Sequence, residues 1–139
     1  MKKILTLLTV VLLAFVGVAK ANAFTLTTGN MTGTIGKYAL VMSLTINDSN
    51  HTVTGWYYYK AKGPRHKIKL SGTCMEQAQY DYSVCINMHE YVGGKKTGFF
   101  LLDYNQKTSM GRAMMWVEGE FTTTAGKTYQ VEIGRSDSL

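Results

Sequence analysis

The residues of this chain that could perform acid–base chemistry are few and form no catalytic pattern. They are three histidines and a small set of carboxylates: His51, His66, His89, Glu76, Glu90, Asp103, Glu118 and Glu120. Acid–base catalysis needs two titratable groups held close together with separated pKa values. His89 and Glu90 are neighbours in a predicted strand, so their side chains must point to opposite faces. The sequence also contains no Gly-x-Ser-x-Gly elbow and no His-x-x-x-His pair, so we expect no catalytic residue and no enzyme.

Glycine–lysine turns and clustered methionines suggest cofactor chemistry only superficially. The runs Gly93-Gly94-Lys95-Lys96-Thr97 and Gly126-Lys127-Thr128 lack the more distant glycine of a phosphate-binding loop. Met110, Met114 and Met115 are soft ligands suited to Cu(I), but methionine also fills small cores and two of the three point to opposite faces. We expect hairpin turns, no metal and no cofactor.

The N-terminus has the features of a secretory signal peptide. Lys2 and Lys3 precede an apolar run of 16 residues, Ile4 to Ala19, and Ala21-Asn22-Ala23 provides a cleavage site. The run is shorter than the roughly 20 residues that span a bilayer, and Phe24 stands where a lipoprotein would carry cysteine. We predict a signal peptide at 1–23, one domain at 24–139, no membrane span, and a periplasmic or secreted bacterial protein.

The net charge is modest once the signal peptide is set aside. Three of the 15 Lys and Arg residues precede residue 24, which leaves 12 against 9 acidic residues, a net charge of +3. These 12 are scattered along the sequence. Because nucleic-acid binding needs a clustered basic patch, we expect no nucleic-acid partner.

Cys74 and Cys85 are the only cysteines of the chain. Disulfides persist in exported proteins, and no Cys-x-x-Cys redox motif is present. We therefore predict a structural disulfide between Cys74 and Cys85.

Two-residue alternation of apolar and polar side chains recurs along the chain and indicates β-strands. It is clearest where Tyr38, Leu40, Met42, Leu44 and Ile46 alternate with smaller or polar residues. Seven strands are predicted, at 37–46, 52–61, 67–71, 83–91, 97–104, 110–120 and 127–133, with an eighth possible within 24–34. We predict an all-β antiparallel meander of about eight strands in a small closed barrel, with a β-sandwich as the alternative.

Apolar residues occupy both faces of three predicted strands. With Tyr57, Phe99, Leu101, Met115 and Val117 in the core, Met114 and the large side chains Trp56, Tyr58, Phe100, Leu102 and Trp116 lie on the second face. The solvated face of an antiparallel sheet should be polar. Either another part of the chain covers this second face, or it is a binding site with Trp and Tyr anchors. Trp56, Tyr58, Phe100, Leu102 and Trp116 are the predicted binding residues.

A series of hairpin motifs resembles a group of exported bacterial β-rich proteins without an assigned activity. It consists of Gly33-Thr-Ile-Gly-Lys-Tyr38, Val53-Thr-Gly-Trp-Tyr-Tyr-Tyr-Lys60, Ile68-x-Leu-x-Gly72, Glu90 and Lys96-Thr-Gly-Phe99. The resemblance covers roughly residues 33–99 and implies a β-rich fold and export. It implies no activity, and the two cysteines are not part of it.

The leading functional hypothesis is an exported, non-enzymatic binding module that recognises a protein or a glycan of the cell envelope through its aromatic residues. One alternative is a carrier with a small apolar ligand inside the barrel. Another is an inhibitor of an extracytoplasmic enzyme such as lysozyme, since inhibitors of that kind share this size and compartment. The sequence shares no motif with them and leaves the oligomeric state open.

Overall fold

The computed structural model describes residues 25–77, 80 and 82–138. Strands form where apolar and polar side chains alternate in the sequence. Their bounds are β1 (Thr25–Thr27), β2 (Met31–Ile35), β3 (Tyr38–Asn47), β4 (Thr52–Tyr59), β5 (Ile68–Gln77), β6 (Tyr82–Val92), β7 (Lys95–Ser109), β8 (Arg112–Thr122) and β9 (Thr128–Ser138). The described residues contain no helix. In this part of the chain there is accordingly no helix with the length and apolar character needed to cross a membrane. The predicted signal peptide, residues 1–23, lies outside the described residues.

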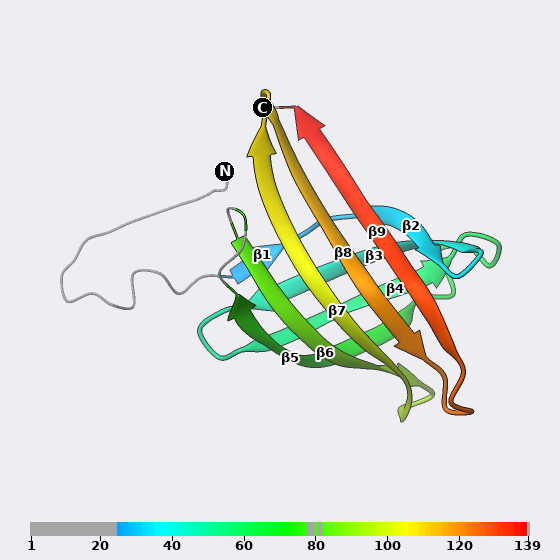
Figure 1. Ribbon diagram of the computed structural model, residues 1–139. Helices are drawn as coiled ribbons and strands as arrows, with labels where there is room; N and C mark the ends of the chain where they lie inside the picture. The colour runs from blue at the N-terminus through cyan, green and yellow to red at the C-terminus, as the bar shows by residue number, and fades with distance from the viewer. Residues whose placement is uncertain (1–24, 78–79, 81, 139) are drawn as a thin grey trace.

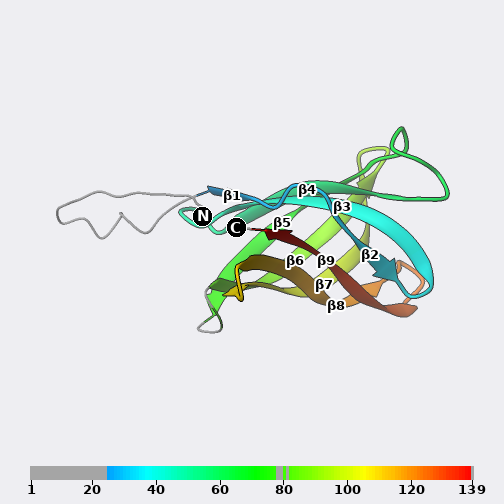
Figure 2. The same ribbon diagram turned by 90° about the horizontal axis from the view of Figure 1, so that it is seen from above.

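Eight of these strands close into an antiparallel barrel. The hydrogen-bonded order is β3-β2-β9-β8-β7-β6-β5-β4, and β4 pairs back with β3 to complete the ring. β1 pairs with the last residues of β3, from Thr45 to Asn47, and lies outside the ring. Figure 1 shows the long strands β7, β8 and β9 crossing in front of β3 and β4, and Figure 2 shows the same two groups as opposite walls. The predicted closed barrel is confirmed.

Apolar side chains fill the interior of the ring. They form one buried cluster with residues from every strand of the barrel: Met31, Ile35, Leu40, Met42, Leu44, Ile46, Val53, Tyr57, Leu70, Cys74, Val84, Ile86, Met88, Phe100, Leu102, Tyr104, Val117, Phe121, Val131 and Ile133. Burial of this apolar surface is the main force that stabilises the barrel. The largest fully buried side chains are Tyr57, Tyr104 and Phe100.

The predicted faces of β4 and β8 are correct, and the predicted faces of β7 are wrong. Phe100 and Leu102 were expected on the second face but are 0% and 1% exposed in the core. Phe99 and Leu101 take the outer positions instead, and Leu101 is 46% exposed. All four residues from Phe99 to Leu102 are apolar, so the sequence pattern does not show which face of this strand is buried.

A bulge in the hairpin between β6 and β7 decides which face is buried. Val92 pairs with Lys95 and Tyr91 with Lys96, but the next regular pair is His89 with Phe99, so the register shifts there. One extra residue in a strand turns every later side chain to the other face. The shift places Phe100 opposite Met88, inside the barrel.

The predicted disulfide is also wrong, because both cysteines are free. Cys74 pairs in the ladder with Ile86, whereas Cys85 pairs with Met75. The two sulfurs therefore lie on opposite faces of adjacent strands, with Cys74 in the core and Cys85 on the outer surface. Two cysteines whose Cβ atoms point apart cannot be bridged without backbone movement.

We expect thiol labelling to find two reactive cysteines in the native chain without any reductant. Burial raises the pKa of both the Cys74 and Cys85 thiols above the ordinary value, so labelling is slow near neutral pH and faster as the pH rises. Cys85 should react first and Cys74 only as the barrel opens, as followed by mass spectrometry after timed alkylation. An intact mass lower by two hydrogen atoms, with no label incorporated, would contradict this arrangement.

Candidate functional site

Trp56 and Tyr58 form an aromatic patch on the outside of β4. They are two residues apart in the strand, so both point away from the core while Tyr57 between them points inward. Their rings are parallel within 12°, with centroids 5.9 Å apart. The ammonium group of Lys67 lies 4.1 Å from the centroid of the Trp56 ring, within cation–π range.

This patch continues across β5 and β6 toward β7. Trp56 lies opposite Lys69 of β5, and Lys69 lies opposite Tyr91 of β6. One pair further along, His89 of β6 lies opposite Phe99 of β7, with ring centroids 4.9 Å apart. The result is one band of partly exposed rings around almost half of the barrel. We call Trp56, Tyr58, Tyr91, His89 and Phe99, with Lys67 and Lys69 between them, the aromatic band.

Glu90 holds the bulge that positions Tyr91 and Phe99 in this band. Its carboxylate points inward and accepts hydrogen bonds from the Tyr57 hydroxyl, the Thr97 hydroxyl (2.8 Å) and the Gly98 amide (3.2 Å). Burial, and then the hydrogen bond to Glu90, raises the pKa of Tyr57 above the ordinary tyrosine value. These three donors satisfy the hydrogen-bonding capacity of the half-buried Glu90 side chain, which gives Glu90 a structural role.

Trp116 lies on the opposite side of the barrel from Trp56. β8 and β4 are separated by four steps around the ring in either direction. The Trp116 indole donates a hydrogen bond to Glu118 (3.3 Å), packs edge-on against Tyr80 (centroids 5.3 Å apart) and lines a shallow depression with Glu132 and Gly134. The predicted single surface with Trp56, Tyr58 and Trp116 together is therefore wrong.

The surface around Trp116 is acidic. Asp103 lies opposite Glu118, and Glu118 lies opposite Glu132, so three carboxylates stand side by side on β7, β8 and β9. Like charges directly opposite one another in a sheet repel. This side of the barrel disfavours an anionic ligand, whereas the lysines of the aromatic band favour one.

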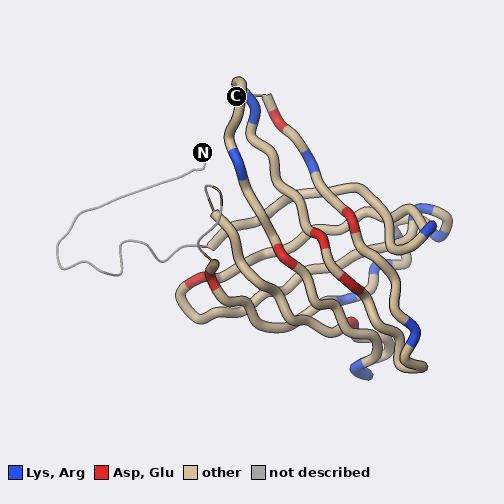
Figure 3. Tube along the Cα trace, in the orientation of Figure 1, with Lys and Arg blue, Asp and Glu red and all other residues tan. Residues whose placement is uncertain are grey.

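Eight basic residues gather at one end of the barrel. They lie in the four connections β2–β3, β4–β5, β6–β7 and β8–β9 or at the strand starts beside them: Lys37, Lys60, Lys62, Arg65, Lys67, Lys95, Lys96 and Lys127. All eight are exposed, and Figure 3 shows them along the right-hand and lower rim. We call this group the basic end. The basic residues are scattered along the sequence, but the expectation that they form no cluster is wrong, because alternate turns of a meander meet at one rim.

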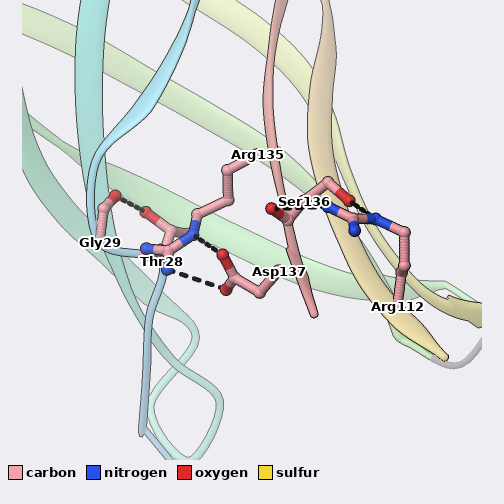
Figure 4. A network of polar contacts seen from close by, with 6 residues as sticks. All are labelled: Thr28, Gly29, Arg112, Arg135, Ser136 and Asp137. Atoms are coloured by element: carbon pink, nitrogen blue, oxygen red, sulfur yellow. Dashed lines mark hydrogen bonds and ion pairs between the residues drawn. The ribbon is translucent and has the colours of Figure 1, made fainter. Parts of the chain in front are cut away.

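The opposite end of the barrel has a polar network of a different kind. The Arg135 guanidinium donates to the Thr28 carbonyl (2.9 Å) and to both carboxylate oxygens of Asp137 (2.8 and 3.2 Å). Arg112 donates to the Ser136 hydroxyl (2.8 Å), and Figure 4 shows both arginines turned toward these partners. The contacts tie β9 to β8 and to the link between β1 and β2, so these cations stabilise the fold.

Sequence reasoning found only part of the aromatic band. It identified Trp56 and Tyr58, because alternation in β4 separates them from Tyr57. It missed Tyr91, His89 and Phe99, whose proximity to Trp56 depends on the neighbouring strands and on the bulge. The Gly93-Gly94 pair in the sequence indicated a tight hairpin turn that brings β6 beside β7. Both glycines have positive φ in the structure (59° and 79°).

The described residues contain no group of three or more His, Cys, Asp or Glu side chains arranged to hold a metal ion. The arrangement on the outer wall is instead one of rings and cations, which suits non-covalent recognition of a ligand with flat apolar faces and negative charge. No protein-family model, no curated protein and no solved structure matches this chain significantly.

Proposed function

We propose that this protein is an exported, non-enzymatic binding module that recognises an acidic glycan of the cell envelope through the aromatic band. The observation that carries the proposal is the continuity of the band. Partly exposed rings from β4, β6 and β7 lie on one outer face, with Lys69 of β5 between Trp56 and Tyr91, and this face would be polar if it only faced water.

The chemistry of the band fits a charged sugar polymer. Aromatic rings attract the electropositive C–H faces of sugars because the ring faces are electron-rich. Lys67 and Lys69 stand next to Trp56 and supply cations for carboxylate or phosphate groups on the same polymer. A band across strands offers a series of shallow contacts along an extended ligand.

The interior and the far wall support the aromatic band as the site of binding. Large side chains, including Tyr57, Phe100 and Tyr104, occupy the barrel interior. The wall around Trp116 carries the carboxylate row of Asp103, Glu118 and Glu132, which repels an acidic polymer.

We expect Trp56→Ala to weaken glycan binding by about tenfold or more, which corresponds to roughly 1.4 kcal/mol. The measurement is affinity electrophoresis and calorimetry with alginate and soluble peptidoglycan fragments as acidic probes and dextran as the neutral probe. Tyr58→Ala should act in the same direction. Circular dichroism establishes that each variant is folded.

Trp116→Ala is the matched control, because it removes the other tryptophan from the acidic wall. It should leave glycan affinity unchanged. Equal weakening by Trp56→Ala and Trp116→Ala, or no binding to any acidic probe, overturns the proposal. Capture of an envelope protein that survives removal of its glycans, and depends on Trp56, would show that the band recognises protein instead.

A further inference from the structure

We propose that the basic end docks the barrel onto an anionic phospholipid surface. This inference concerns the rim of the barrel, and of its eight cations only Lys67 also belongs to the aromatic band. Its basis is the placement of eight exposed cations, six in the connections β2–β3, β4–β5 and β8–β9 and two at the start of β7, which are far apart in the sequence and gather at one end of the fold.

Among the described residues, none of the cations of the basic end forms an ion pair. The connections 36–37, 60–67, 93–94 and 123–127 contain no acidic residue. The one ion pair between described residues joins Arg135 and Asp137 at the opposite end. Glu90 is the nearest carboxylate in the β6–β7 hairpin, and it points inward to Tyr57, Thr97 and Gly98.

The shape of the group favours a plane over a linear polymer. The four connections are alternate turns of an antiparallel ring, so they lie at the same end of the barrel and distribute the cations around a rim instead of along a line. Proteins that bind a single-stranded nucleic acid place their cations in a row along a groove. Anionic headgroups attract clustered lysines, each with roughly a fivefold gain in binding.

Two exposed apolar side chains lie among these lysines. Tyr38 at the β2–β3 turn is 50% exposed, and Val92 at the β6–β7 turn is 51% exposed. Tyrosine prefers the boundary between headgroups and acyl chains. Exposed cations together with exposed apolar side chains are typical of protein surfaces that bind at a membrane interface.

The test is co-sedimentation of the protein with vesicles of equal parts phosphatidylcholine and phosphatidylglycerol, and with pure phosphatidylcholine vesicles. We expect binding to the anionic vesicles alone, with a loss at high salt because salt screens the attraction. The double variant Lys95→Gln, Lys96→Gln should bind about 30-fold more weakly, since it removes two lysines from the rim.

Lys107→Glu is the matched control. It lowers the net charge by the same two units and lies in the same strand, β7, near the opposite end of the barrel. It should leave vesicle binding within about twofold. Trp56→Ala should also leave vesicle binding unchanged, so that failure of this proposal and failure of glycan recognition are distinguishable.

Equal binding to both kinds of vesicle, or equal weakening by Lys107→Glu and by the double variant, overturns the membrane proposal. Tighter binding of a single-stranded DNA oligonucleotide than of the anionic vesicles at the same salt also overturns it. That last result would assign the basic end to a nucleic acid.

Discussion

Phe100→Ala should destabilise the native barrel by about 4 kcal/mol, because removal of a buried phenylalanine costs 3–5 kcal/mol. The Phe100 ring is fully buried and contacts the rings of Tyr57 and Phe121, with centroid distances of 5.6 and 4.6 Å. Small proteins are stable by only about 5–15 kcal/mol, so the loss brings the variant close to unfolding. Urea denaturation followed by circular dichroism measures it.

Phe99→Ala is the matched control for this experiment. It removes the same side chain from the adjacent residue, but that ring lies on the outer surface against His89. We expect a loss of about 1 kcal/mol or less, as is usual for surface positions. If Phe99→Ala proves more destabilising than Phe100→Ala, then Phe99 faces the core and the bulge beside Glu90 is absent.

Alkaline pH should remove a large part of the stability of the barrel from about pH 10 upward. Burial raises the pKa of Tyr57 and of Tyr104 above the ordinary value, and for Tyr104 this outweighs the smaller, opposite effect of Arg135. In the unfolded chain both tyrosines lose their protons near pH 10, while in the native barrel they keep them. The stability is therefore complete below about pH 10 and falls as the pH rises toward the folded-state pKa values.

The expected size of this effect follows from proton linkage. Above pH 10, ionisation of each tyrosine in the unfolded chain lowers the free energy of unfolding by about 1.4 kcal/mol per pH unit. The two tyrosines together therefore remove about 5 kcal/mol of stability by pH 12. Urea titrations between about pH 9 and about pH 11.5 measure the slope of this linkage. The double variant Tyr57→Phe, Tyr104→Phe should show a shallower slope, whereas the exposed Tyr38→Phe serves as the control. A free energy of unfolding that stays constant over this range would contradict the burial of both hydroxyls.

The sequence by itself determined the local period of the chain. Alternation around Leu40, Met42 and Leu44 predicted a strand with one buried face, and the structure confirms it. The same logic placed Tyr57 inside and Trp56 outside, because side chains of neighbouring residues in a strand point in opposite directions. Short strands separated by polar turns then indicated a closed antiparallel barrel.

Only the tertiary structure decided which residues face or neighbour one another across strands. The faces of Phe99 and Phe100 depend on a single bulge, and the separation of Cys74 from Cys85 depends on the register of β5 with β6. Closure of the ring places Trp116 on the opposite side of the barrel from Trp56. The same closure brings the basic turns together at one rim. A period of two is a property of each strand, whereas register and closure arise from interactions between strands. The aromatic band and the basic end depend on register and on closure.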